Sequence, residues 1–75
     1  MKLETVVASV FGISESEVSD STELKSIPAW DSMTHMVLIS RLEEQYSVQL
    51  TGDEIADMQT IGDARRFLSG HGATV

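Results

Sequence analysis

Three residues near the middle of the chain, Asp31, Ser32 and His35, have the side-chain types used in hydrolytic catalysis. In a catalytic triad, a histidine activates the serine and a carboxylate orients the far nitrogen of that histidine. Here Ser32 and His35 would be neighbours on one helical turn, and Asp31 sits beside Ser32 instead of behind the histidine. No glycine-rich turn in the sequence supplies an oxyanion hole. We therefore expect that this chain is not an enzyme.

A second group of candidate residues consists of the carboxylates Asp53, Glu54 and Asp57. Their spacing fits neither a calcium-binding loop nor a histidine–carboxylate site, so we expect a solvated helix face and no metal. We expect His71, near the C-terminal end, to be too isolated to serve as a metal ligand. The chain has no cysteine, which excludes a disulfide framework, a thiolate nucleophile and a cysteine-based metal site.

The composition describes one small acidic domain. The 75 residues support a single domain over residues 1–75, which would bury roughly 60% of the surface of its unfolded chain. Twelve acidic residues against five basic ones give a formal net charge of −7, so the basic footprint needed to bind nucleic acid is missing. An acidic surface favours basic protein partners, although it would equally keep a small domain soluble.

The sequence shows no sign of a membrane-bound or exported protein. Its apolar runs are too short to cross a membrane, and the first residues, with Glu4 among them, do not resemble a signal peptide. We therefore expect no membrane insertion, a cytoplasmic location and a monomeric state.

Apolar residues recur at helical spacing in four stretches. The predicted helices cover residues 2–11, 32–46, 51–58 and 61–70. Gly12 is expected to end the first helix in the left-handed conformation, and residues 70–75 to form a flexible tail. Residues 47–50 alternate like a strand but have no partner, so we interpret them as extended loop. The sequence thus predicts an all-α fold, a four-helix bundle with a short third helix.

A long loop, residues 13–31, separates the first two helices. It has no sustained periodicity, but Val18, Leu24 and Ile27 are spaced as apolar anchors that would hold it on the core. A structureless loop of this length is unusual in a compact domain and is often functional.

The second helix has two apolar sides on a helical wheel. The core side carries, in order, His35, Leu38, Ile39, Leu42 and Tyr46. Met33 and Val37 lie nearly opposite, with Glu44 beside them. An apolar group next to a helix start indicates a contact site, and methionine suits surfaces that accept varied partners. Asp31 or Ser32 is also expected here simply as the helix cap.

Residues Asp31-Ser32-Met33, followed by a helix that ends in "LEEQY", resemble the Asp-Ser-Leu motif of the acyl carrier protein family. The resemblance covers nearly the whole chain, including "DSTEL" before the motif, the length and the acidity. It implies an acyl-carrier-like bundle in which Ser32 bears 4′-phosphopantetheine, whose thiol carries acyl groups as thioesters. Asp31 then belongs to the motif that the phosphopantetheinyl transferase recognises. A phosphate on Ser32 would lie at the positive end of the helix dipole.

The resemblance also implies roles for the neighbouring residues. The residues expected to contact partners are Trp30, Met33, Val37 and Glu44. The partners are the phosphopantetheinyl transferase (holo-carrier synthase), an acyl-loading ligase or acyltransferase, and downstream acyl-processing enzymes. The residues expected to line an acyl cavity are His35, Leu38 and Leu42.

The sequence around the motif leaves the pathway open. Carriers of fatty acid synthesis usually have a small residue before Asp-Ser, whereas Trp30 stands here. They also carry several acids along the second helix, where this chain has Arg41. This form is similar to stand-alone carriers of specialised pathways, so fatty acid, polyketide and specialised biosynthesis are all retained. A peptidyl or aminoacyl carrier and a helical adaptor without a prosthetic group are the alternatives.

Overall fold

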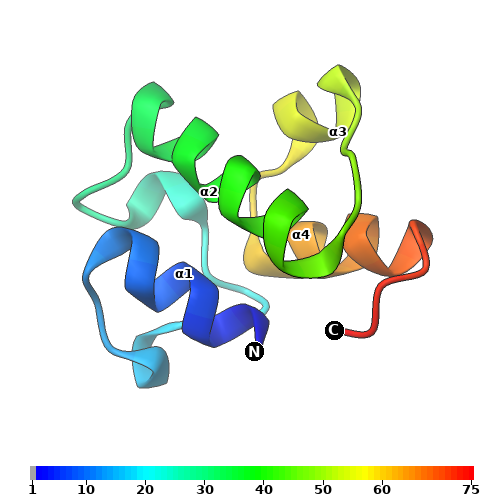
Figure 1. Cartoon of the computed structure of the whole chain (residues 1–75). Helices are drawn as coiled ribbons and strands as arrows, with labels where there is room; N and C mark the ends of the chain where they lie inside the picture. The colour runs from blue at the N-terminus through cyan, green and yellow to red at the C-terminus, as the bar shows by residue number, and fades with distance from the viewer. Residues whose placement is uncertain (1) are drawn as a thin grey trace.

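The computed structural model describes residues 2–75 as four α-helices joined by loops (Figure 1). The helices are α1 (Leu3–Phe11), α2 (Ser32–Tyr46), α3 (Gly52–Asp57) and α4 (Ile61–Gly70). The predicted all-α fold, with its long first loop and short third helix, is confirmed. Met1, the first residue of the predicted domain, lies outside the described residues. Within residues 2–75, every helix is too short or too polar to cross a bilayer.

Helix α2 runs diagonally through the molecule (Figure 1). Its first residues lie at the upper left of that view and α3 lies at the upper right, whereas both ends of the chain lie in the lower part. Helix α1 packs against α2, and the short α3 and the longer α4 follow on the other side (Figure 1). The start of α2 is therefore remote from the chain ends.

One apolar core joins the four helices with the long loop. Its completely covered side chains, with an exposure of 0%, are Val7, Leu38, Leu42, Ile61, Ala64 and Leu68. The three predicted loop anchors are buried as well: Val18, Leu24 and Ile27. Gly12 ends α1 with a positive φ of 66°, a conformation that glycine adopts without steric cost.

The long loop is fastened to the start of α4 by backbone hydrogen bonds. The N–H of Ile61 donates to the carbonyl of Thr22 over 3.1 Å, and the N–H of Gly62 donates to that of Asp20 over 2.9 Å. A Cβ at position 62 would lie 3.0 Å from the Asp20 carbonyl oxygen, so this close approach favours a glycine. The loop also contains two 3-10 turns, η1 (Glu15–Glu17) and η2 (Leu24–Ser26).

The C-terminal residues fold back onto the bundle. His71 has one polar partner, since its Nε2 lies 2.8 Å from Oε1 of Glu54. The chain reverses after α4, where the N–H of Ala73 donates to the carbonyl of Leu68, and Val75 packs partly against the core. The flexibility of residues 70–75 stays a prediction.

Candidate functional site

Helix α2 begins with a capping box built by Asp31 and Thr34. Oδ1 of Asp31 accepts the N–H of Thr34, and Oγ1 of Thr34 accepts the N–H of Asp31, both over 2.8 Å. The backbone N–H of Thr34, followed by its hydroxyl, lowers the pKa of the Asp31 carboxyl below its ordinary value. Asp31 is therefore the cap, and Ser32 is the first residue inside the helix.

The side chain of Ser32 is free of this cap. Ser32 is exposed, and neither its hydroxyl nor its backbone N–H makes a hydrogen bond to residues 2–75. The first N–H groups of a helix lack partners within the helix and carry its positive dipole end. An exposed hydroxyl and a backbone donor, both without a partner among residues 2–75, thus lie together at an open helix start.

Three exposed apolar side chains lie close to this start, on one face of α2. Met33 is 76% exposed, Met36 49% and Val37 41%, and we call these three residues the apolar rim. The opposite face of α2 is buried, with Leu38, Ile39 and Leu42 at 0–2% exposure. The predicted separation of two apolar faces is confirmed.

Met36 is an addition to the predicted contact residues. It lies within one arc of the helical wheel with Met33 and Val37, so the spacing alone contained the signal. Glu44 is exposed as well, but it lies about 18 Å further along the helix than Ser32 at the standard rise per residue. A partner that contacts both Ser32 and Glu44 must cover most of α2.

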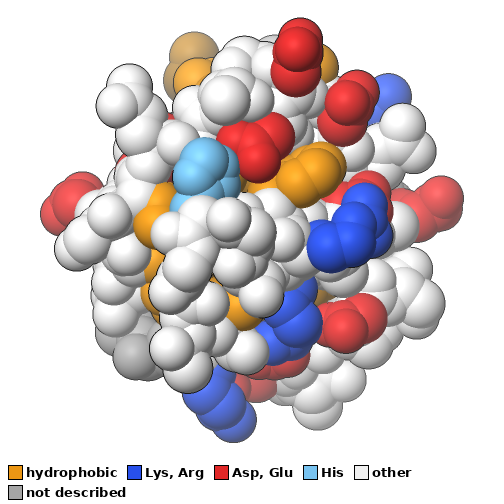
Figure 2. Space-filling view, turned by 90° about the vertical axis from the view of Figure 1, so that its right-hand side faces the viewer, with side chains coloured by type: hydrophobic (Ala, Val, Ile, Leu, Met, Phe, Trp, Pro, Cys, Tyr) orange, Lys and Arg blue, Asp and Glu red, His pale blue; other side chains and the backbone are white. Residues whose placement is uncertain are grey.

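The acids expected on a solvated face belong to α3 (Figure 2). Asp53 and Asp57 are exposed and Glu54 is half-buried. In this view of the α3–α4 side, several acidic side chains lie in the upper part, and others lie lower down among the basic ones. Residues 2–75 bring no three metal-ligating side chains together.

Trp30 and His35 are joined by a hydrogen bond across the start of α2. Nε1 of Trp30 donates to Nδ1 of His35 over 3.2 Å, with the rings edge to face at 68°. Nε2 of His35 lies 3.0 Å from the carbonyl oxygen of Ile55 in α3. Because Nδ1 accepts, the ring proton is on Nε2, which donates to Ile55. Both side chains are half-buried.

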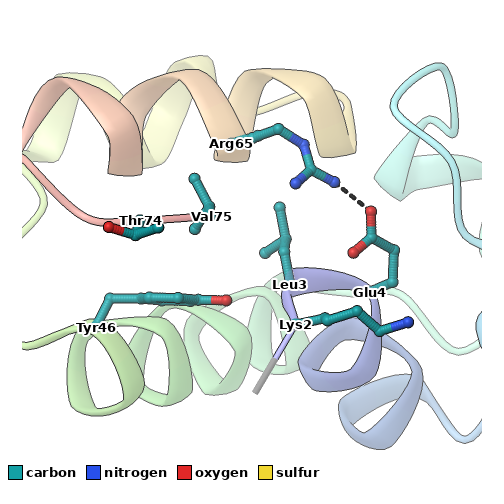
Figure 3. A pocket seen from close by; sticks show the side chains of 7 residues that line it. All are labelled: Lys2, Leu3, Glu4, Tyr46, Arg65, Thr74 and Val75. Carbon is teal, nitrogen blue, oxygen red and sulfur yellow. Dashed lines mark hydrogen bonds and ion pairs between the residues drawn. The ribbon is translucent and has the colours of Figure 1, made fainter.

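The predicted acyl-lining residues lie on the inner face of α2. Leu38 and Leu42 are completely covered, so an acyl chain would reach them only after neighbouring elements moved apart. A concave region of about 440 Å³ lies instead at the other end of α2, beside Tyr46 (Figure 3). There the guanidinium of Arg65 pairs with Glu4 and with Asp20.

Comparisons with known proteins address the chain as a whole. Residues 2–68 match the family described as "Phosphopantetheine attachment site". The chain is also similar to a holo acyl carrier protein from Geobacter metallireducens, whose structure was solved by solution NMR. The two are 28% identical with a TM-score of 0.82, and the match covers 92% of this chain and 79% of the other.

Proposed function

The chain belongs to the phosphopantetheine-attachment family of acyl carriers, and we propose that Ser32 is the residue that bears its arm. Carriers of this family are not enzymes, and their prosthetic group is 4′-phosphopantetheine. When bound, it supplies a thiol that holds an acyl group as a thioester. The observation that carries the proposal is the exposed Ser32 hydroxyl at the open start of α2, which has no hydrogen-bond partner among the described residues 2–75.

The residues at the start of α2 fit a phosphodiester. The carboxylate of Asp31 is engaged by Thr34, so it does not compete for the Ser32 hydroxyl. The N–H of Ser32 and the positive end of α2 favour a negatively charged group at this point. Asp31 fixes the direction in which α2 begins and so presents Ser32 to the transferase.

The apolar rim is the part of the surface that partner enzymes would contact beside the arm. Met33 and Val37 belong to it, and Met36 extends it. Exposed apolar groups next to a functional residue favour protein contact. Trp30 and Glu44 are further proposed contacts, although the half-burial of Trp30 leaves only part of its ring to a partner.

The inner face of α2 is a buried apolar destination for acyl cargo on the arm. We propose that His35, Leu38 and Leu42 line the space that a bound acyl chain enters. Since Leu38 and Leu42 are completely covered, this space must open before the chain is accommodated.

The proposed pathway role is that of a monomeric carrier. It would be loaded in the cytoplasm, where coenzyme A is available, by a dedicated ligase or acyltransferase, and would serve fatty acid, polyketide or specialised biosynthesis. The first three turns of α2 carry no acid, which favours partners that bind apolar side chains there. A peptidyl or aminoacyl carrier is the second candidate.

The test is modification by a phosphopantetheinyl transferase with coenzyme A, followed by intact-mass measurement. The reaction joins Ser32 Oγ to the phosphorus of the arm and releases the adenosine bisphosphate half of coenzyme A. The wild type should gain the mass of one arm, and Ser32→Ala should not. Ser40→Ala, which removes another exposed serine of α2, should be modified like the wild type. Modification of Ser32→Ala would refute the proposal, and an unmodified wild type would favour the adaptor without a prosthetic group.

A further inference from the structure

The segment that leads into Ser32, residues 28–31, is attached to the body of the protein through one side chain above all. Ile27, just before the segment, is buried. Within the segment Trp30 alone is half-buried, and the other three residues are exposed. Trp30 also packs partly against the core. The direction in which the chain reaches Ser32 therefore depends on how Trp30 is held.

His35 holds the indole of Trp30 through its ring. Nε1 of Trp30 donates to Nδ1 of His35 over 3.2 Å, and Nε2 of His35 lies 3.0 Å from the carbonyl oxygen of Ile55. An indole N–H can only donate, and a carbonyl oxygen can only accept. These two partners leave the imidazole one arrangement, the neutral ring with its proton on Nε2. The acceptor that Trp30 needs is therefore set by the fold.

The capping box and the Trp30–His35 pair act on different parts of the motif. The cap joins Asp31 to Thr34, so it fixes the first turn of α2. The pair joins the residue before Asp31 to a residue about one turn beyond Ser32, so it fixes the incoming chain relative to the helix. The chain is thus held on both sides of Ser32, while the side chain of Ser32 stays exposed.

We propose that Trp30 and His35 are positioning residues for the modification of Ser32, because their hydrogen bond holds residues 28–31 in the arrangement that the transferase binds. The hydrogen bond belongs to the structure, whereas its role in modification rests on the function proposed above. Since Ser32 lies between this segment and α2, an enzyme that reaches its hydroxyl lies against both. A segment that is already ordered loses less conformational entropy on binding.

The pair takes no part in the chemical step itself. In that step the Ser32 oxygen loses its proton and bonds to the phosphorus of the arm, as the bond from that phosphorus to adenosine bisphosphate breaks. The net contribution of one hydrogen bond corresponds to about a 3- to 10-fold change in an equilibrium constant. Loss of the pair should therefore lower kcat/KM for the carrier by that factor, chiefly through its KM. The KM for coenzyme A should stay unchanged.

The first test is nitrogen NMR of the histidine rings in the complete chain without an arm, at a pH at which imidazoles are neutral. Nδ1 of His35 should give the signal of an unprotonated ring nitrogen, and Nε2 that of an N–H. Trp30→Phe should shift the Nδ1 signal of His35 and leave the signals of His71 unchanged. A proton on Nδ1 of His35, or an Nδ1 signal that Trp30→Phe does not move, would overturn the hydrogen bond and the proposal with it.

The second test measures kcat/KM for modification by a phosphopantetheinyl transferase with coenzyme A. Trp30→Phe and His35→Phe each remove the hydrogen bond but keep an aromatic ring, so each should lower kcat/KM about 3- to 10-fold. The double variant should be no slower than the slower single variant, because both changes break the same bond. His35→Gln, which keeps a donor and an acceptor, should restore most of the rate.

Thr60→Ala is the control, because it removes a side-chain hydrogen bond at the start of another helix, α4. It should keep the wild-type kcat/KM. Wild-type rates in Trp30→Phe and His35→Phe, effects that multiply in the double variant, or equal slowing by Thr60→Ala would overturn the role in modification. If the wild type is not modified at Ser32, the proposed function fails and this role fails with it, whereas the NMR signals still decide whether the hydrogen bond exists.

Discussion

The starts of α2 and α4 use the same cap, yet only the start of α2 is open. Asp31 and Thr34 form the capping box of α2, and Thr60 and Asp63 form that of α4. Each cap satisfies backbone donors that every helix start leaves without partners. The cap alone therefore does not mark a functional site.

The two starts differ at the first residue inside each helix. In α4 this residue is Ile61, which is completely buried and whose N–H donates to Thr22 in the long loop. In α2 it is Ser32, which is exposed and has no hydrogen-bond partner among residues 2–75. The long loop covers one helix start and leaves the other accessible. Accessibility of the first turn, and not its capping chemistry, separates the start of α2 from that of α4.

The largest expected effect separates these two first residues. Ile61→Ala should lower the free energy of unfolding by about 2–5 kcal/mol, because it removes buried methyl groups and leaves a cavity. Ser32→Ala at the equivalent position should change it by less than about 0.5 kcal/mol, as for an exposed side chain without contacts. Urea denaturation measures both. Comparable losses would show that the start of α2 is not open.

The two caps should contribute similar stability but different function. Asp31→Ala and Thr60→Ala should each lower the free energy of unfolding by about 1 kcal/mol. Only Asp31→Ala should also slow modification by the transferase. Asp31→Asn keeps a capping oxygen but removes the negative charge, so it separates the contribution of the cap from that of the charge. If Thr60→Ala slowed modification as much, the effect would be one of general stability.

Acid should weaken both caps. Backbone N–H groups lower the pKa of Asp31, chiefly that of Thr34, and the pKa of Asp63, chiefly that of Thr60. A lowered pKa means that the stabilisation is complete above the ordinary aspartate value of about 3.9 and is lost as the pH falls below it. Unfolding measured from pH 5 to pH 2 should show this loss. Asp31→Asn and Asp63→Asn should each reduce the loss of unfolding free energy as the pH falls. An unaltered pH dependence would show that these two carboxylates do not cause the loss.

The smallest effect on stability is expected at the apolar rim. Met33→Ala and Val37→Ala should change the free energy of unfolding by less than about 0.5 kcal/mol but slow acyl transfer to or from partner enzymes. Met58→Ala is the matched control, because Met58 is 4% exposed and its truncation should cost about 2–5 kcal/mol. A stability loss at Met33 close to that at Met58 would place the rim inside the core.

Local periodicity predicted most of the fold. The spacing of apolar residues predicted the four helices. The anchors of the long loop are the isolated apolar residues in a polar segment, and they are buried as expected. The two faces of α2 followed from its angular period. These features depend on residues a few positions apart, which is the range that a sequence pattern describes.

The contacts made by the histidines could not be predicted in this way. His35 and Ile55 are 20 residues apart, and His71 and Glu54 are 17 apart, so their meeting depends on how the helices pack. The choice of Asp31 over Ser32 as the cap depends on one backbone torsion at the helix start. The spacing of Asp31 and Thr34 did contain the signal of a capping box.

The most direct test of the central claim is to locate the arm on protein purified from the cells that make it. Fragment mass spectrometry should find one phosphopantetheine, with or without an acyl group, on the fragment that contains Ser32. The mass of any thioester would also identify the cargo. A protein that carries no arm in those cells, or an arm on a residue other than Ser32, would contradict the account.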